Sequence, residues 1–312
     1  GALIYGAGNT ITNSFADIDV PSGIFSAAAA ADSFRDSVQQ NPGGAALAIG
    51  GGNKIDHAVR SQAIGVNNTL TGNLYHTPDV NEYSAQYNMV DGYNNNVANV
   101  NHAYVIGTHN IQGKTFSDAT KDGVLSEKDR EKAQKDDNLI VIGDNHTLAN
   151  DVSNNIILGT AGTADKTLTT SVSNVVMIGH NADAQKEGGV ALGADSVAAI
   201  DKEAVGYDPT TKKASTATSF IWKSTAAAVS VGRAEEKDID DNVTTPAITR
   251  QITNLAAGFN DTDAVNVAQL KAVMNLPVQI YNGGKVASSG YLSGSQIAKD
   301  MTISNLQFDF GD

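Results

Sequence analysis

The sequence contains no cysteine, which excludes thiol catalysis, cysteine–zinc sites and disulfide bonds. Aromatic residues make up only 6% of the chain and charged residues 18%, against roughly 25% charged residues in an average globular protein. Proline is scarce, at 6 residues, whereas glycine is common, at 30. Because small residues stand where large core side chains would be needed, a thick hydrophobic core is not expected, and the chain must bury its surface in another way.

Positive charge is also in short supply, because 21 Lys and Arg stand against 34 Asp and Glu, for a net charge of −13. Affinity for phosphate rests on basic side chains, so no nucleic-acid partner is expected. Attraction to anionic lipid is not expected for the same reason. An acidic surface does keep a crowded surface protein soluble, and this is the role that we expect for the charge.

Long hydrophobic runs are missing as well. No stretch of 18 apolar residues occurs, so no helix is expected to span a membrane. The chain begins at Gly1 without a secretory leader and stops abruptly at Asp312, and we expect both ends to be fragment boundaries.

What the sequence does contain is one short motif that is repeated along the chain as far as Gly232. It consists of alternating small and aliphatic residues, then a glycine, then a polar stretch rich in asparagine. Close copies follow one another at spacings of 13 to 16 residues. The copies end at Gly6, Gly50, Gly65, Gly107, Gly143, Gly159, Gly179, Gly193 and Gly232, with weaker copies at Gly92 and Gly206. Such a unit is too short for a pair of helices and fits two short strands joined by two turns.

The glycine of each copy is expected at a sharp turn with positive φ, which only glycine adopts without strain. Asparagine tolerates the left-handed turn conformation and recurs just after the glycine. These asparagines are Asn9, Asn53, Asn67, Asn110, Asn145 and Asn181. One unit cannot bury its own apolar face, so we expect the units to stack strand on strand around a thin row of Ile, Val, Leu and Ala, as in a solenoid.

The spacing breaks at four places, where we expect insertions at about residues 12–45, 71–87, 112–138 and 207–222. In the first of them, the alanine-rich residues 26–40 precede a turn with proline and glycine and predict a short helix. The insertions carry aromatic residues that are candidates for receptor binding: Phe34, Tyr75, Tyr83, Phe116 and Trp222. The same rings can equally hold the insertions against the solenoid, and the sequence leaves both interpretations open.

The third insertion contains the best metal-binding candidate, a loop with the spacing of an EF-hand calcium loop. Its candidate ligands are Asp118, Thr120, Asp122, Val124 (through its carbonyl) and Asp129. Thr120 stands where Asp or Asn is usual, and Asp129 stands where Glu is preferred, so any affinity for calcium would be weak. A helix is expected over residues 126–135. The alternative to a Ca²⁺ site is an Asx turn followed by the N-cap of a surface helix, and no cofactor is required.

After Gly232 the repeat stops, and two segments follow, Arg250-Gln-Ile-Thr-Asn-Leu-Ala-Ala-Gly258 and Asp261-Thr-Asp-Ala-Val-Asn-Val-Ala-Gln-Leu270. Asp263 is in position to cap a helix that begins at Ala264, and Val267, Leu270 and Met274 have the spacing of a coiled-coil seam. Together the two segments resemble the neck motif of the trimeric autotransporter adhesins, and the preceding Ile-Gly repeats resemble the YadA-like head of the same family. The residues that this resemblance assigns to the neck and to trimerisation are Asp263, Val265, Asn266, Val267 and Leu270.

The resemblance implies an all-β fold, a left-handed parallel β-roll (solenoid) with helical insertions, which forms a homotrimeric head over residues 1–245. Residues 246–275 would be a neck leading into a short coiled coil. Residues 276–312, where Leu276-Pro277 stops the helix, would begin a further small β module. The family also implies the bacterial cell surface, with outer-membrane anchoring by a C-terminal region outside this sequence. Its partners would be matrix proteins, host cells or other bacteria.

Two other functions stay open beside an adhesive head. Glycan-active β-solenoid enzymes such as lyases need aligned carboxylates or basic residues on one face, and the repeat has none. A purely structural spacer would have uninterrupted repeats. The six histidines are scattered, and Gly290-Tyr-Leu-Ser-Gly294 has the wrong spacing for a nucleophile elbow. We therefore predict no catalytic residue and a binding protein, not an enzyme.

Overall fold

The computed structural model describes residues 1–15, 26–40, 44–76, 81–116, 125–274, 277–282, 285–291 and 307–309. The chain divides into two compact units, Gly1–Arg250 and Gln251–Asp312. Nearly all of the buried side chains belong to the first unit, where the repeats stack into a parallel β-roll.

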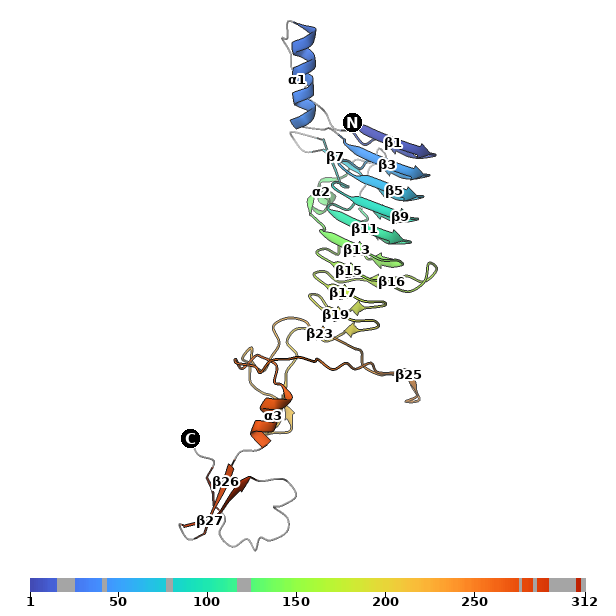
Figure 1. Ribbon diagram of the computed structural model, residues 1–312. Coiled ribbons are helices and arrows are strands. Elements are labelled where there is room, and N and C mark those ends of the chain that lie inside the picture. The colour runs from blue at the N-terminus through green and yellow to red at the C-terminus, as the bar shows by residue number, and fades with distance from the viewer. Residues whose placement is uncertain are drawn as a thin grey trace. The chain divides into compact units, whose positions relative to one another are not determined.

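Every copy of the repeat except the one at Gly206 forms one strand, and these strands stack in parallel into one long sheet, here called sheet A (Figure 1). Their register places glycine beside glycine, so that Gly50 pairs with Gly6 on one side and with Gly65 on the other. In the described residues this sheet has ten strands: β1 (Ala2–Ala7), β3 (Ala46–Gly51), β5 (Gln62–Val66), β9 (Met89–Tyr93), β11 (Ala103–Thr108), β13 (Leu139–Ile142), β15 (Ile156–Leu158), β17 (Val176–Ile178), β19 (Val190–Leu192) and β23 (Val229–Ser230). The weak copy at Gly92 belongs to it, whereas the one at Gly206 does not.

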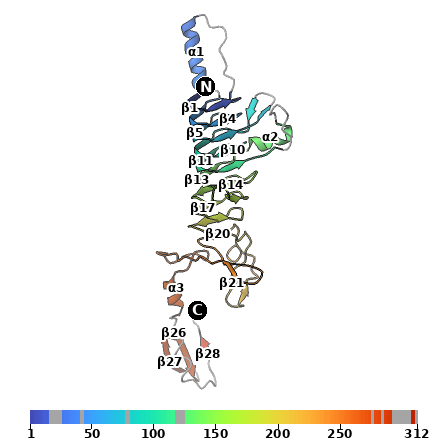
Figure 2. The ribbon, with the colours of Figure 1, turned by 90° about the vertical axis from the view of Figure 1, so that its right-hand side faces the viewer.

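A second, shorter strand follows most copies and builds a second parallel sheet, sheet B, which runs beside sheet A (Figure 2). Its described strands are β2 (Thr10–Thr12), β4 (Lys54–Asp56), β6 (Thr69–Thr71), β10 (Asn96–Ala98), β12 (Ile111–Gly113), β14 (His146–Leu148) and β16 (Leu168–Thr170), and the pair β18 (Asp183–Ala184) and β20 (Val197–Ala198) follows them along the roll. Strands of the two sheets alternate along the chain, so one coil gives one strand to each. The predicted parallel β-solenoid with two strands per unit is confirmed.

The core between the sheets is one side chain thick and is filled by pairs of residues seven positions apart. Ala48 of sheet A and Ile55 of sheet B belong to one coil and are fully buried. The next coils use Ala63 with Leu70, Val90 with Val97, Val141 with Leu148, Met177 with Ala184 and Ala191 with Ala198. A small residue on one sheet is often matched by a larger one on the other, and this keeps the filled volume similar from coil to coil.

The glycines form a stack along the turn that leads from sheet A to sheet B. Gly50 has φ +115°, and a Cβ atom there would overlap the carbonyl oxygen of Gly65 in the next coil. The same holds from Gly6 to Gly179, so both the backbone conformation and the close approach of neighbouring coils require glycine. The predicted positive φ is confirmed for the stacked glycines from Gly6 to Gly193 and is wrong for Gly206 and Gly232.

The asparagines after the glycine occupy two different positions, which the sequence did not distinguish. Asn67, Asn145 and Asn181, two residues after the glycine, are left-handed, with φ between +52° and +65°. Asn53 and Asn110, one residue further on, have ordinary φ and are fully buried. The prediction of a left-handed turn is therefore wrong for this second position, because these side chains satisfy buried backbone groups instead.

Asparagines of successive coils form a continuous hydrogen-bonded ladder, here called the Asn ladder: the partly exposed Asn9 and the buried Asn53, Asn68, Asn95 and Asn110. Asn68 donates its backbone N–H and its Nδ2 to Oδ1 of Asn53, both at 3.0 Å. Nδ2 of Asn68 also donates to the carbonyl oxygens of Ile64, at 2.8 Å, and Gly92, at 2.9 Å. Each buried amide of the Asn ladder thus joins three coils in a site that excludes water.

His146 takes the next position of the Asn ladder. Its N–H donates to Oδ1 of Asn110 at 3.0 Å, and its Nε2 lies 2.6 Å from the Gly159 carbonyl oxygen, to which it donates in that tautomer. The ring is 1% exposed, and burial lowers the pKa of His146 despite the hydrogen bond to Gly159 and the charge of Asp144, which oppose it. The folded chain therefore favours the neutral imidazole.

This arrangement predicts an acid sensitivity that one substitution removes. The unfolded chain binds a proton at His146 near pH 6.5, whereas the folded chain resists protonation, so the free energy of unfolding falls as the pH drops below about 6.5, by at most about 1.4 kcal/mol per pH unit. His146→Asn restores the ladder residue and should flatten this part of the curve, measured by urea unfolding between pH 4.5 and 8 (roughly the range around the His pKa). The exposed His180→Asn is the control, and a curve for His146→Asn like that of His180→Asn would contradict the assignment.

The insertions add helices and hairpins to the roll. The predicted helix over residues 26–40 is confirmed as α1 (Ala27–Gln40), which has no buried residue, and the one over residues 126–135 is confirmed as α2 (Glu127–Gln134). The second insertion forms the hairpin β7 (Leu74–His76) and β8 (Asn81–Tyr83), and the fourth contains the hairpin β21 (Tyr207–Asp208) and β22 (Lys213–Ala214). A last hairpin, β24 (Glu236–Lys237) and β25 (Val243–Thr245), precedes Arg250.

The second unit contains one helix, α3 (Val267–Met274), in its described part. Strands β26 (Pro277–Asn282), β27 (Lys285–Tyr291) and β28 (Gln307–Asp309) form an antiparallel sheet with β26 in the centre. The strands expected beyond Leu276 are therefore present. In none of the described helices is there a segment both long and apolar enough to cross a membrane.

Candidate functional site

The outward-facing side of sheet A is apolar along the described roll. Its side chains form two rows that follow the strand register, here together called the outer face of sheet A. One row is Leu3, Leu47, Gln62, Met89, Tyr104, Ile140, Ile156, Val176, Val190 and Val229, and the other is Tyr5, Ile49, Ile64, Asp91, Ile106, Ile142, Leu158, Ile178 and Leu192. Only Gln62 and Asp91 interrupt the apolar rows, and none of the nineteen side chains is buried in the single chain.

The outer face of sheet B has the opposite character. Its positions carry mostly threonine, lysine, aspartate and asparagine, such as Thr10, Lys54, Asp56 and Asn96. Ile111, at 46% exposure, is its large aliphatic exception. An apolar face of this length is unusual on a soluble chain and marks a surface that another molecule covers, whereas the polar face of sheet B is suited to water.

Two of the five candidate aromatic residues lie inside the chain. Tyr75 is 2% exposed and Tyr83 is 4% exposed, and Tyr75 packs with Leu125 and Ala133, with Phe116 against this cluster. Burial, followed by the charge of Glu82, raises the pKa of Tyr75 to about 12. Tyr75 thus packs the second insertion against the third, whereas the Tyr83 ring lies beside the rings of Phe15 and His57. Neither ring is exposed where a receptor would bind.

The remaining candidate aromatics are exposed to different degrees. Phe34 on α1 is 46% exposed and Trp222 is 37% exposed, while Phe116 is half-buried. They come from three different insertions, and no described contact joins them into one site. Their receptor-binding role stays a prediction.

Sequence reasoning missed a ring system at the base of the second insertion. Tyr87 stacks on His102 at 4.9 Å between ring centroids, and the Arg60 guanidinium lies 5.5 Å from the Tyr87 ring. Arg60, Tyr87 and Tyr104 line a groove of about 400 Å³. Such flat, partly exposed rings beside a cation are suited to planar or sugar-like ligands. Tyr87 has a left-handed backbone, with φ +56°. This conformation is unusual for tyrosine, but it cannot be recognised from the sequence.

The candidate calcium loop falls mostly outside the described residues. Asp118, Thr120, Asp122 and Val124 are outside them, and Asp129 lies on α2, where it is 5% exposed. In the part of the chain that the structure describes, no group of three or more His, Asp or Glu side chains is placed to hold a metal ion. Calcium binding therefore stays a prediction.

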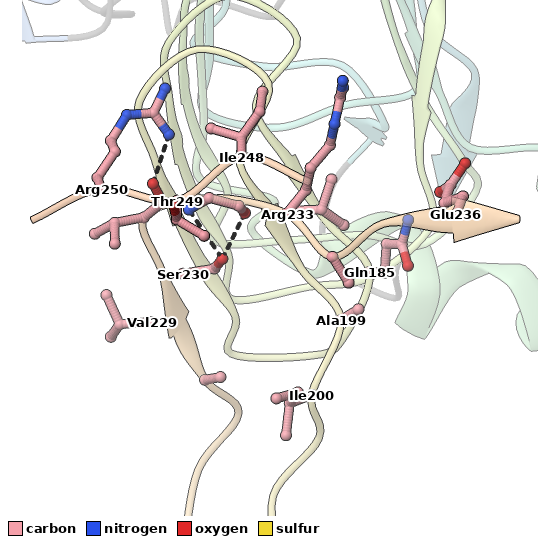
Figure 3. Close-up of a pocket in the computed structure, with 15 residues that line it drawn as sticks. Gln185, Ala199, Ile200, Val229, Ser230, Arg233, Glu236, Ile248, Thr249 and Arg250 are labelled. Atoms are coloured by element: carbon pink, nitrogen blue, oxygen red, sulfur yellow. Dashed lines mark hydrogen bonds between the residues drawn. The ribbon is translucent and has the colours of Figure 1, made fainter. Parts of the chain in front are cut away.

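The end of the roll is closed by an arginine. The Arg250 guanidinium donates to the carbonyl oxygen of Val231 (Figure 3). It also donates to the carbonyl oxygen of Ala194, at 2.8 Å, and to Oγ of Ser196, at 3.0 Å. It lies against Gly193, where the next glycine of the stack would otherwise be. Arg250 thus donates hydrogen bonds to backbone carbonyl groups that the last coil would otherwise leave without partners.

Beside Arg250 the last coil leaves a cavity of about 500 Å³ (Figure 3). Its walls are largely aliphatic, with Ile200, Val229 and Ile248, and Arg233 and Glu236 also line it. Val229 is 64% exposed and Ile200 59% exposed. The cavity offers an apolar surface and no nucleophile paired with a base.

The helix of the second unit begins later than the sequence predicts. Asp263 does not cap it, because the helix begins at Val267 and Asn266 is the residue before it. Asn266 Oδ1 accepts the Gln269 N–H at 3.0 Å, and Gln269 Oε1 accepts the Asn266 N–H at 3.2 Å, which is a reciprocal capping box. Asp263 instead accepts the N–H groups of Asn260 and Phe259, each at 2.9 Å, and these bonds lower its pKa.

The apolar residues assigned to the neck are exposed in the single chain. Val265, Val267 and Leu270 are 68%, 66% and 55% exposed. Phe259 is 95% exposed. Like the outer face of sheet A, this segment presents apolar side chains that its own chain leaves uncovered.

Comparison with known proteins gives two matches. Residues 251–277 match the family described as the coiled stalk of trimeric autotransporter adhesin. The autotransporter adhesin BadA of Bartonella henselae is 45% identical over 135 residues, which is 38% of this chain and 4% of that protein. The chain thus spans only a small part of the length of this relative. Part of this chain is thus similar to the trimeric autotransporter adhesins, through the stalk motif at residues 251–277 and through the 45% identity to BadA over 135 residues.

Proposed function

We propose that this chain is the adhesive head of a bacterial surface protein, that it acts as a homotrimer, and that it binds receptors without catalysing a reaction. The similarity to an autotransporter adhesin supports adhesion and an extracellular location at the cell surface. The receptors proposed are matrix proteins, host-cell surfaces or other bacteria. Anchoring in the outer membrane would come from a part of the protein beyond this chain.

The observation that supports self-association is the contrast between the two outer faces of the roll. Sheet A presents aliphatic rows to solvent, and sheet B presents mainly polar side chains. A core only one side chain thick buries little area per residue, so a further apolar surface gained by association contributes to stability. Self-association through the outer face of sheet A supplies this burial.

Receptors would then bind to the surfaces that self-association leaves exposed, which include the insertions. The insertions leave the repeating roll, and Phe34 and Trp222 expose part of their rings there. Three copies of each insertion would engage several receptors at once, and the effective concentration gained makes weak single contacts sufficient.

An array of matrix proteins, glycans and bacterial surfaces, probed with the whole chain, tests this function. Phe34→Ala, Tyr87→Ala and Trp222→Ala remove one exposed ring each, and Ile239→Ala, which truncates a fully exposed side chain outside these sites, is the control. We expect the parent and Ile239→Ala to bind one receptor class alike and at least one aromatic variant to lose about tenfold or more, as for an interface anchor worth over about 1.4 kcal/mol. An array on which the associated, folded parent binds nothing would refute the adhesive function, and equal binding by all variants would refute the role of the rings.

A further inference from the structure

Lys114 and Asp137 form a buried pair at the two ends of the third insertion. Lys114 directly follows β12, and Asp137 lies two residues before the first residue of β13. The Lys114 Nζ lies 2.8 Å from Oδ1 of Asp137, and the side chains are 3% and 2% exposed. Two charges so far from water are costly to maintain, so the pair needs a better explanation than a surface ion pair does.

The surroundings of the pair are dry. A gap of about 10 Å³ beside it is lined by Val100, Leu139, Leu148 and Val152, and Asp151 reaches its edge. This volume is at the lower limit for a single water molecule. Burial raises the pKa of Asp137 although the charge of Lys114 opposes the shift. Burial thus disfavours the charged carboxylate of Asp137.

The contacts of the pair also orient it for reaction. Asp137 Oδ2 accepts the Asn101 backbone N–H at 2.8 Å, which polarises the carboxyl group and leaves Oδ1 facing the amine. The Lys114 Nζ is held by the carbonyl oxygens of Lys132, at 3.1 Å, and Lys135, at 3.2 Å. A nucleophile and a carbonyl carbon fixed side by side react as if at very high concentration.

We propose that Lys114 and Asp137 condense to an intramolecular isopeptide bond. The Nζ–Cγ bond forms and the Cγ–Oδ1 bond breaks, and Oδ1 leaves as water with two protons from the ammonium group. The ion pair becomes a neutral amide, and no oxidant or co-reactant is consumed. Asp151, which also lines this gap and whose carboxylate pairs with Lys132 at 2.8 Å, is the candidate to relay a proton between the amine and the leaving oxygen.

The isopeptide bond would join the two ends of the third insertion covalently. It closes residues 114–137 into a covalent ring and fixes α2 and Phe116 to the roll. The chain has no cysteine, so no disulfide can do this. A cross-link of this kind limits the unfolded state and resists local opening, as a disulfide of the same loop length would.

The intact mass of the purified full chain, measured after denaturation, tests the proposal. We expect the parent to be lighter than its sequence by one water molecule, and Lys114→Arg to have its full mass. Lys128→Ala is the matched control, because Lys128 is an exposed lysine of α2 outside the proposed site, and it should keep the loss of water. A folded parent with its full sequence mass would overturn the proposal and leave a buried ion pair only.

Peptide mapping separates the isopeptide from a succinimide, which also loses water. The isopeptide gives one branched peptide that joins Lys114 to Asp137, resists mild alkali and blocks tryptic cleavage after Lys114. Asp137→Asn, if it reacts, should lose ammonia in place of water. A loss of water that maps to Asp122-Gly123 or disappears in mild alkali would also contradict the assignment.

Discussion

Asn68→Ala is expected to lower the free energy of unfolding by about 3–5 kcal/mol, since each buried polar group left unpaired costs about 1–3 kcal/mol. The substitution strips partners from the carbonyl oxygens of Ile64 and Gly92 and from both donors of Asn95. Asn68 and Asn95 are 0% and 1% exposed, so water does not replace the lost bonds. Urea unfolding followed by circular dichroism measures the effect.

The control for this experiment is Asn150→Ala. Asn150 is exposed, and its side chain donates a single hydrogen bond, to Oγ1 of Thr115 at 2.9 Å. Its loss should change the free energy of unfolding by no more than about 0.5 kcal/mol. Equal, small effects for the two variants would mean that the Asn ladder does not stabilise the roll.

Ile142→Glu is expected to disrupt self-association, because Ile142 lies in the middle of the outer face of sheet A. A carboxylate carried into an apolar interface without a partner costs several kcal/mol and favours the separated chains. Sedimentation or light scattering should show a lower mass for this variant than for the parent at the same concentration. The side chain is 44% exposed in the single chain, so the fold of the separated chain should survive the change.

Ile111→Glu is the matched control, with the same change at 46% exposure on the outer face of sheet B. It should associate like the parent, because that face is expected to contact water. If Ile111→Glu dissociates and Ile142→Glu does not, the interface lies on sheet B, and the proposed interface on sheet A is contradicted. If neither variant changes the mass, sheet A is not the interface.

The coil architecture could be predicted from the sequence because its signals are local. Glycine at a positive φ and alternation before it are properties of a few neighbouring residues, and they identified strands such as β3, β11 and β13. The helices α1 and α2 were likewise predicted within one or two residues from composition and from the turn that follows α1.

Which side of a strand faces inward could not be predicted so simply. In β3, Ala46 and Ala48 are buried, whereas Leu47 and Ile49 point outward. Both sides of the strand are apolar. The alternation therefore predicts a strand but does not show which of its two sides faces the core. A monomer would place the larger residues inside, and the reverse arrangement follows only if a partner covers the outer face.

The long-range polar contacts were also beyond the sequence. Asn67 and Asn68 are neighbours of the same type, but one is left-handed and exposed while the other is buried in the Asn ladder. Lys114 and Asp137 lie in a charged insertion and read as solvated residues, yet the fold buries both. Asp263 was chosen as a helix cap because aspartate is a common one, whereas the reciprocal bonds of Asn266 and Gln269 decide where α3 begins.

The molecular mass of the whole chain in solution tests the central claim most directly. If the apolar outer face of sheet A is covered by sister copies, light scattering should give three times the mass of one 32.4 kDa chain, 3 × 32.4 = 97.2 kDa. A stable particle of 32.4 kDa that keeps the β-sheet signal in circular dichroism would contradict the account.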